Sequence, residues 1–555
     1  MRLYLDLETD TAHQQIWCAA YAIDDGEPQV TTDKWQCKCI VEAADEIVNH
    51  NLIGFDAPVL ERLWGIKIPF KKMVDTLVMS RLWNPALPDG HSLEAWGARL
   101  GTPKGEFRAY DDGYSEEMAE YAKQDIVVTR QLYQYLYNQL ATEKFSTDSI
   151  TLEHQVAYII EGQVRNGITF EFMEALNLRD TLENRMRAIE AQMQQVFPPI
   201  ITERYSEKTG KRLKDLVEEF NPGSRQQVAF RLQQLGVVFP ETTETGLPKV
   251  DEDVLAKINT PESALISEYL MLQKRLGLVA AWIKACGNDG KIRGRVITNG
   301  AVTGRMTHYS PNLAQIPAVG APYGKECRSL FVPSFGKVMV GIDASALELC
   351  MLAHYMKDDD FTKSVVEGKK EDKTDVHSRN QAAAGLPTRD QAKTFIYALL
   401  YGAGPGKIGS IVGGGAREGM VLIDTFMENM PKLARLKHNV EKAAEVTDAT
   451  LKGLDKRRLR IRSAHSSLNT LLQSAGAIVM KQALVILYRS LKRYKLDARF
   501  LLNVHDEWQI EASPDHAEEV ARLGVLAIKE AGEVLKLNCP LSGEAKIGKN
   551  WAETH

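Results

Sequence analysis

The sequence predicts a multidomain protein of mixed α/β and α+β class, and three observations support this prediction. The chain has 555 residues, which at about 150 residues per domain corresponds to roughly three or four domains. Strand-like alternation followed by helix signals appears at residues 2–8 and at residues 337–356. Residues 151–294, between them, show mostly helical patterns. We therefore expect an N-terminal α/β unit, a helical region and a second unit that combines a sheet with helices.

Composition narrows the class of protein. Hydrophobic residues make up 44% of the chain and charged residues 25%, the values of a globular protein with a large core. No run approaches the roughly 18 apolar residues of a membrane helix, and the acids in MRLYLDLETD differ from the apolar centre of a signal peptide. Seven scattered cysteines suit a reducing cytoplasm. We expect no membrane partner and no export.

The charge of the chain gives a mixed signal about nucleic acid. A net charge of −5 argues against such a partner, but the distribution of charge matters more than its sum. Residues 452–462, KGLDKRRLRIR, hold six basic residues and one acid. A basic run of this kind is usually a solvated face of a protein. We interpret it as supporting evidence for nucleic-acid binding and no more.

Four acids in the N-terminal unit form one candidate metal site. Asp6 and Glu8 lie two residues apart on one face of a predicted strand, where two carboxylates can share a metal. Asp56 stands just before a predicted helix, and Asp125 follows Tyr121 by one helical turn. Three of the four have a plain alternative: a polar face of an edge strand for Asp6 and Glu8, and an N-cap for Asp56. Only the four acids together, with Tyr121 beside the last, predict a site that binds two metals and directs a water at a phosphodiester.

A second candidate site begins in residues 337–356, KVMVGIDASALELCMLAHYM. Alternating valine and isoleucine residues predict a strand, and Asp343 stands at its end. Ser345 with Glu348 three residues later matches a capping box, which predicts that a helix opens there. The Asp343 carboxylate is therefore expected to project from the end of a strand.

The second site is completed by residues 499–512, RFLLNVHDEWQIEA. Two apolar runs flank His505 and Asp506, which predicts a tight hairpin with the acid at its tip. If adjacent strands bring Asp343 and Asp506 together, the pair can hold two divalent cations about 3.5–4 Å apart for in-line phosphoryl displacement. Taken singly, Glu348 is explained as a helix cap and Asp506 as part of a solvated turn.

Residues 388–402, TRDQAKTFIYALLYG, form the most specific helix signal in the chain. A capping box opens it, and Gly402 begins the stop GAGPG. A stripe of side chains recurs every four residues on one face, namely Arg389, Lys393, Tyr397 and Tyr401. Basic groups near a helix N-terminus suit a polyphosphate, and a tyrosine one turn later suits a base or sugar. The alternative is an amphipathic helix with a basic, aromatic outer face.

Six short motifs of the chain resemble motifs of the family A DNA polymerases. DASALELC, RDQAKTFIYALLYG and VHDE resemble their motifs A, B and C, and DLET, NLIGFD and YAKQD resemble the three motifs of the 3′–5′ proofreading exonuclease domain. NGAVTGR, SPNLAQIP, TFIYALLYGAG and LNTLLQSAGA are most similar to phage replicative members. The resemblance covers nearly the whole chain, with the six motifs in order.

The resemblance implies a fold and its division into domains. An RNase H-like exonuclease domain is expected at residues 1–145, followed by a right-hand polymerase domain. Within the latter, the thumb and helical connection occupy residues 146–294 and the fingers residues 356–463. The palm is formed by residues 295–355 and 464–555.

The resemblance also implies roles for individual residues. In the polymerase, Asp343 and Asp506 are expected to hold two Mg²⁺ ions, for which Mn²⁺ can substitute. Expected contacts with the incoming nucleotide are Arg389, Lys393, His377 and Tyr401, with Glu348 and Tyr397 as the gate against a ribose 2′-hydroxyl. Expected contacts with DNA are Arg305, Asn469, Gln473 and His505. In the exonuclease, Asp6, Glu8, Asp56 and Asp125 are expected metal ligands, and Tyr121 positions the attacking water. A tyrosine at position 397 implies tolerance of dideoxynucleotides.

The expected partners are primer–template DNA, deoxynucleoside triphosphates and a helicase–primase, in the host cytoplasm. No long thumb insertion is evident, so we expect no dependence on thioredoxin. The chain begins at the proofreading domain, so we expect no 5′-nuclease activity. Ala346 and Cys350 replace the glutamine and arginine of many relatives in motif A, which leaves local contacts there open.

Three other interpretations remain. One is a nucleic-acid-binding protein with vestigial metal sites, against which the intact acids at every motif position count. A second is a repair polymerase, which strand displacement and product length per binding event would distinguish. A third is a preference for a modified base, presented to Arg305 and Gln473 in the minor groove.

Overall fold

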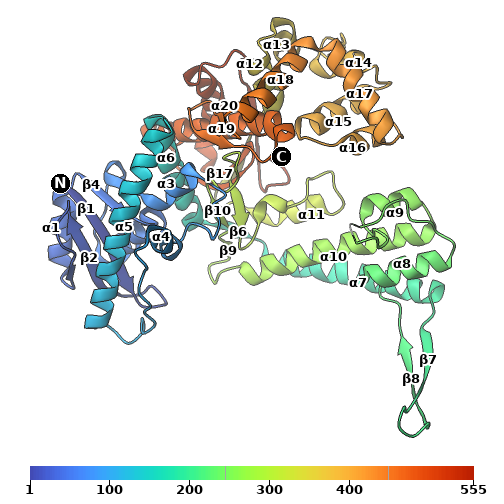
Figure 1. Cartoon of the computed structure of the whole chain (residues 1–555), viewed down its shortest axis with the longest axis horizontal. Coiled ribbons are helices and arrows are strands. Elements are labelled where there is room, and N and C mark those ends of the chain that lie inside the picture. The colour runs from blue at the N-terminus through green and yellow to red at the C-terminus, as the bar shows by residue number, and fades with distance from the viewer. Residues whose placement is uncertain (244, 448) are drawn as a thin grey trace.

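A computed structural model describes residues 1–243, 245–447 and 449–555 of the protein. Its elements fall into an N-terminal α/β unit, a helical arm and a larger mixed unit (Figure 1). The N-terminal unit, drawn in blue, lies at one end of the long axis. The arm, in green, extends from the middle of the view toward the end opposite the N-terminal unit, below a layer of orange helices. The predicted mixed α/β and α+β class is confirmed.

The N-terminal unit is built on a five-stranded sheet of order β3-β2-β1-β4-β5. Its strands are β1 (Arg2–Thr9), β2 (Ile16–Ile23), β3 (Gln29–Thr31), β4 (Glu46–Asn49) and β5 (Met73–Asp75). Its helices are α1 (Lys34–Ala43), α2 (Ala57–Trp64), α3 (Thr76–Trp83), α4 (Leu93–Leu100) and α5 (Glu116–Thr142). Because β1 pairs with both β2 and β4, the edge-strand alternative is wrong. Leu3 and Tyr4 enter different hydrophobic cores on the two faces of the sheet, as their alternation predicts.

Helix α6 (Thr147–Asn166) leads from this unit to the arm. The long helices α7 (Phe172–Val196) and α10 (Pro261–Ala285) pack together, and α8 (Arg225–Gln234) and α9 (Glu252–Ile258) lie near their far end (Figure 1). Between α7 and α8, strands β7 (Ile200–Tyr205) and β8 (Arg212–Glu218) form an antiparallel hairpin that projects away from the arm (Figure 1). At the base of the arm, β12 (Phe331–Val332), β6 (Ile168–Phe170) and β9 (Lys291–Ile292) form a small sheet.

The larger unit contains a four-stranded sheet of order β16-β17-β13-β18. These strands are β13 (Val338–Ala344), β16 (Ala498–Val504), β17 (Glu507–Ala512) and β18 (Gly543–Gly548). Helices α19 (Ser467–Arg493) and α20 (Pro514–Val534) pack with them around one core. A strand pair, β10 (Arg295–Ile297) with β11 (Thr307–Tyr309), and the helices α11 (Gly324–Ser329) and α12 (Leu347–Met356) complete this part.

A layer of helices follows α12 in the chain and lies at the upper right of Figure 1. It consists of α13 (Asp359–Val366), α14 (Val376–Ala384), α15 (Arg389–Leu400), α16 (Pro405–Ser410), α17 (Ala416–Asn429) and α18 (Pro431–Val446). The hairpin of β14 (Thr450–Lys452) and β15 (Arg458–Arg460) returns the chain to α19. This hairpin contains most of the basic run of residues 452–462. Arg457 within it is buried and ion-paired, so the interpretation of the run as a solvated face is wrong for this residue.

By length and composition alone, α19 qualifies as a membrane-spanning helix, which the count of consecutive apolar residues did not indicate. However, 78% of its apolar window is buried inside the protein. This burial is typical of a core helix, because the apolar side chains of α19 already contact other protein atoms.

The predicted capping box at residue 345 is wrong. Helix α12 begins at Leu347, and its N-cap is Ala346 in a left-handed conformation (φ 50°) without a side-chain capping bond. The Glu348 carboxylate instead accepts hydrogen bonds from Arg305 and Tyr401. The local sequence favours a cap, but two long-range donors bind this carboxylate in the folded protein.

Candidate active sites

The polymerase candidate site lies where β13 meets the β16–β17 hairpin. His505 and Asp506 form the two-residue turn of this hairpin, and His505 adopts the left-handed φ of 58° that such turns use. In the antiparallel register, Asp343 faces Glu507, and the Ala344 amide donates to the Asp506 carbonyl at 3.1 Å. The structure therefore brings Asp343, on β13, close to Asp506, in the turn of the neighbouring hairpin, as the sequence predicts.

The electrostatics of this pair suit a cation. Desolvation, followed by repulsion from Asp506 and Glu507, raises the pKa of Asp343 to about 7. Asp343 is nevertheless exposed to solvent, so a cation can reach its carboxylate. Burial and repulsion from Glu348 raise the pKa of Asp506 to about 6. Neighbouring carboxylates that resist ionisation bind a hard divalent cation readily, because the cation removes their repulsion.

Glu507, which the sequence did not single out, supports the pair. Its buried carboxylate accepts a hydrogen bond from the Trp551 indole, and one oxygen lies 2.8 Å from His555 Nδ1. His555 also offsets part of the rise in the pKa of Asp343. No local pattern connects residues 507 and 555, because only the folded chain brings them together.

Glu348 stands at the centre of a polar group facing the pair. Its Oε1 accepts from the Arg305 guanidinium at 3.1 Å and from the Tyr401 hydroxyl at 2.7 Å. Burial, then Glu348 and Asp506, raise the pKa of Tyr397 to about 12, so this tyrosine also lies near the acids. A recess is lined by Arg305, Glu348, His505 and Asp506 among others. The structure therefore brings the predicted gate and Arg305 to one wall of the site.

The predicted stripe on α15 runs toward this recess. At its start, the Arg389 guanidinium donates to Asp375 Oδ2 at 3.0 and 2.7 Å. Burial alone would raise the pKa of Asp375, but the hydrogen bonds and charge of Arg389 lower this pKa to about 2. Lys393 is exposed one turn later, and the Tyr397 ring lies 6.1 Å from that of His377. Among the described residues His377 Nδ1 is buried without a hydrogen-bond partner, as expected of a group that awaits a ligand.

The capping box of α15 is confirmed in part. Thr388 accepts from the Gln391 amide at 3.2 Å, whereas the Gln391 side chain donates to the Ile411 carbonyl. Asn469 and Gln473 lie one turn apart on α19, and the Asn469 amide donates to the Leu400 carbonyl. Asn469 thus fixes the end of α15 on α19. The predicted DNA contacts of these two residues, and of His505, stay predictions.

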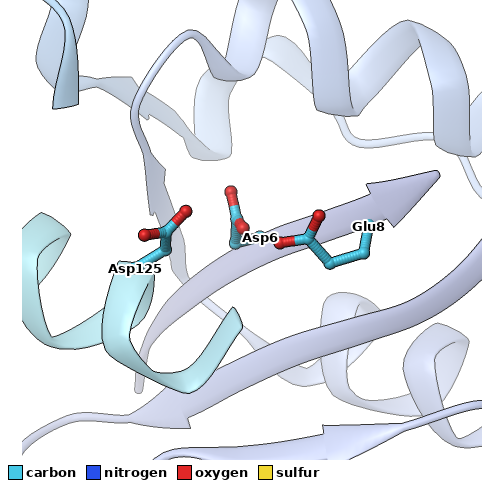
Figure 2. A group of neighbouring side chains, drawn as sticks. All are labelled: Asp6, Glu8 and Asp125. Atoms are coloured by element: carbon cyan, nitrogen blue, oxygen red, sulfur yellow. The ribbon is translucent and has the colours of Figure 1, made fainter. Parts of the chain in front are cut away.

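The second candidate site lies in the N-terminal unit (Figure 2). Asp6 and Glu8 project from β1 and Asp125 from α5, and each offers an oxygen within 4.8 Å of the others. Asp56 ends the π-helical turn of residues 52–56 and stands at the N-cap position of α2, as the alternative predicts, but its carboxylate forms no capping bond, so capping does not explain the acid. Asp56 is not in the group of three, but its carboxylate is close enough to Asp6 for repulsion to raise its pKa.

Burial and mutual repulsion dominate the chemistry of these acids. Burial, then Asp6 and Asp125, raise the pKa of Glu8 to about 9, and burial with Asp6 raises that of Asp125 to about 7. Among the described residues, Asp56 Oδ1 and Asp125 Oδ1 are buried without hydrogen-bond partners. A set of carboxylate oxygens, some unpaired, fits the ligand preference of Mg²⁺ or Mn²⁺.

Sequence reasoning missed three supporting residues at this site. Lys104 Nζ lies 2.5 Å from Asp125 Oδ2 and 4.7 Å from the centre of the Tyr121 ring. Asn49 donates to Asp6 at 3.2 Å, and the Tyr110 hydroxyl donates to that of Tyr121 at 3.1 Å. Lys104 and Tyr110 belong to the segment between α4 and α5, where no hydrophobic period gives a signal. Tyr121 and Asp125 line one cleft, as their spacing on the helix predicts.

Comparison with known proteins identifies the family of the chain. The family model described as DNA polymerase family A matches residues 199–553. The DNA-directed DNA polymerases of Enterobacteria phage T3 and Escherichia phage T7 are each 34% identical to this chain over 92% of both lengths. The solved POL domain of Pol1 from M. smegmatis, in a complex with DNA primer-template and dNTP, shares the fold. Its TM-score is 0.83 at 19% identity, and it covers 100% of this chain and 96% of its own. The chain therefore belongs to DNA polymerase family A.

Proposed function

We propose that this family A DNA polymerase extends primers by two-metal phosphoryl transfer and removes mispaired ends at a separate 3′–5′ exonuclease site. The observation that carries the proposal is the presence of two groups of acids on two different sheets, one around Asp343 and one around Asp6. The roles of individual residues come from the resemblance and are consistent with their positions. Mg²⁺ is the proposed metal at both sites.

In the polymerase site, Asp343 and Asp506 would hold the metals. When bound there, the metals would supply a lower pKa for the primer 3′-hydroxyl and positive charge for the leaving pyrophosphate. Lys393 and Arg389 would bind the triphosphate at the N-terminus of α15, where the helix dipole favours negative charge. Arg389 would then share its guanidinium between phosphate and Asp375, which already orients it. Glu348 and Tyr397 would exclude a ribose 2′-hydroxyl.

In the exonuclease site, Asp6, Glu8, Asp56 and Asp125 would hold the metals. Tyr121, held by the Tyr110 hydroxyl and covered by Lys104, would orient a water toward the terminal phosphodiester. A mispaired primer end frays more readily than a paired one and so reaches this site more often.

A primer-extension assay tests the proposal directly. A 5′-labelled primer on a template, matched or mispaired at its end, is incubated with Mg²⁺ with and without the four dNTPs. We expect extension of the matched primer with dNTPs, and removal of the mispaired nucleotide before extension. Extension without any shortening of the mispaired primer would contradict the exonuclease part alone. Absence of extension with any divalent metal would favour the binding-protein alternative.

We expect Tyr397→Phe to lower incorporation of dideoxynucleotides relative to deoxynucleotides by about fivefold or more. A dideoxynucleotide lacks the 3′-hydroxyl, and the Tyr397 hydroxyl would supply the hydrogen-bonding group that is missing; one such bond is worth about 1 kcal/mol or more. The ratio of incorporation rates for ddTTP and dTTP measures the effect. Tyr401→Phe is the matched comparison, since its hydroxyl donates to Glu348 instead. An unchanged ratio in Tyr397→Phe would remove this role.

The proposed role is genome replication with a helicase–primase, rather than repair, and the similarity to DNA-directed DNA polymerases of phages supports the replication part. The insertion between α7 and α8 is only the short β7–β8 hairpin, which supports independence from thioredoxin. We therefore expect added thioredoxin to leave product length unchanged when an unlabelled DNA trap limits each enzyme to one binding event. Products several-fold longer with thioredoxin would contradict this. Strand displacement in the same assay separates replication from repair.

A further inference from the structure

A buried cluster of charged side chains connects α6 with α19 and the β14–β15 hairpin, and the proposed mechanism does not use it. Glu153 on α6 is fully buried, and its two carboxylate oxygens lie 2.7 and 2.9 Å from Lys481 Nζ on α19. Arg457 Nη1 lies 2.7 Å from Glu153, and Arg457 Nη2 lies 2.6 Å from Asp455. Two acids and two bases thus balance each other inside the protein.

Stability alone is a weak reason for such a cluster. The attraction between buried ions is largely offset by the loss of their hydration, and apolar groups of similar size often stabilise as well. Removal of one partner is costly, because it leaves a buried charge unpaired. We therefore expect the charged cluster to be rigid, and the residue that it holds in place indicates the role of the cluster.

The group held in place is Asn299. Its Oδ1 lies 3.4 Å from Arg457 Nη1 and 3.5 Å from Lys481 Nζ, and its amide donates to the Arg81 carbonyl at 2.8 Å. Arg81 belongs to α3 of the N-terminal unit, so Asn299 is bound from both units at once. Asn299 is itself buried and lies between β10 and β11.

The segment that starts at Asn299 ends at Arg305. Gly304 adopts a left-handed conformation (φ +76°), and a Cβ placed on it would meet Arg457 Nη1 at 2.9 Å and Asn299 Oδ1 at 3.2 Å. The Arg457 guanidinium therefore packs directly against the backbone before Arg305. Arg305 in turn donates to Glu348, which accepts from Tyr401. Contacts thus run without a gap from the N-terminal unit to the recess that Arg305 and Glu348 line.

We infer that Glu153 is a positioning residue for Arg305. Glu153 fixes Arg457 and Lys481, these fix Asn299 and the backbone at Gly304, and the segment 299–305 then presents Arg305 to the primer terminus. Docking of the N-terminal unit on α6 and α19 therefore strengthens the hold of the polymerase site on DNA. This inference rests on the proposed function of Arg305 in binding the minor groove of the new base pair.

A double-mutant cycle tests the inference. Glu153→Gln, Arg305→Ala and the double variant are compared in single-nucleotide incorporation over a range of primer–template concentrations. We expect Glu153→Gln to lower kcat/KM about tenfold, mainly through KM for primer–template. The double variant is expected to be no worse than Arg305→Ala, because residues that act as one unit are not additive. Degradation of single-stranded DNA is expected to stay at the parent rate in all three.

Glu143→Gln is the matched control. Glu143 also joins the two units, with an oxygen 3.5 Å from Arg460 and a hydrogen bond from Trp83, but it does not contact segment 299–305 within the described chain. We expect parent-like KM in this variant. Equal behaviour of Glu153→Gln and Glu143→Gln, or losses that multiply in the double variant, would overturn the inference. An unaffected Arg305→Ala would instead overturn the proposed role of Arg305.

A second variant tests the inference if Glu153→Gln does not fold. Loss of a cooperative thermal unfolding transition would show that Glu153→Gln has not folded. Asn299→Ala removes the shared contact and leaves all four charges in the cluster. We expect it to raise KM for primer–template as Glu153→Gln does, again without a further loss when combined with Arg305→Ala. A parent-like KM in Asn299→Ala would overturn the inference by itself.

Discussion

Asp343→Asn and Asp506→Asn are each expected to lower primer extension by about 10³-fold or more and to leave degradation of single-stranded DNA unchanged. Each substitution keeps the size of the side chain but removes a charged oxygen from the pair. Metal stabilisation of the transition state is worth several kcal/mol, and about 4 kcal/mol corresponds to about 10³-fold in rate. The rate of single-nucleotide incorporation under saturating dNTP and primer–template measures the loss.

Glu544→Gln serves as the control for these variants. Glu544 lies opposite Asp343 on β18 and is exposed, so it shares the sheet and the local field but not the hairpin. We expect it to retain extension within a few-fold of the parent. Comparable loss in Glu544→Gln would mean that the general charge of this sheet, rather than the Asp343–Asp506 pair, supports extension. Loss of both extension and degradation in Asp343→Asn would contradict the proposal of two separate sites.

The combined variant Asp6→Ala with Glu8→Ala is expected to show the reverse pattern. Degradation of single-stranded DNA should fall by about 10³-fold or more, because both metal-binding carboxylates on β1 are removed. Extension of a matched primer should stay at the parent rate, since neither residue touches the β13 sheet among the described contacts. Shortening of a 5′-labelled single strand, followed over time with Mg²⁺, measures the loss.

Glu120→Gln is the control on the exonuclease side. Glu120 lies on the same helix as Asp125 but is exposed and pairs with Lys123 at 2.7 Å. Degradation should continue in it at the parent rate. Retention of degradation in the Asp6→Ala, Glu8→Ala variant would show that the nuclease site lies elsewhere. If this variant still shortened a mispaired primer before extending it, that second assay would lead to the same conclusion.

Local sequence patterns determined the elements that carry both sites. The leucines of β1 alternate because successive side chains of a strand point to opposite faces, and this fixes Asp6 and Glu8 on one face. The turn at His505 and Asp506 and the spacing on α15 follow from equally local rules. The six ordered motifs add the family, which the comparisons confirm. The domain limits and the role of each residue stay predictions.

Tertiary structure alone decided which side chains support these sites. Glu348 matched a cap but bonds to Arg305 and Tyr401, and Lys104 reaches Asp125 from a segment without periodicity. The basic run at residues 452–462 suggested a surface, yet Arg457 is buried against Glu153. The reason is physical. Periodicity reports how a residue meets its own helix or strand, whereas pairing of buried charges depends on residues hundreds of positions apart, such as Glu153 and Lys481, becoming neighbours only in the folded chain.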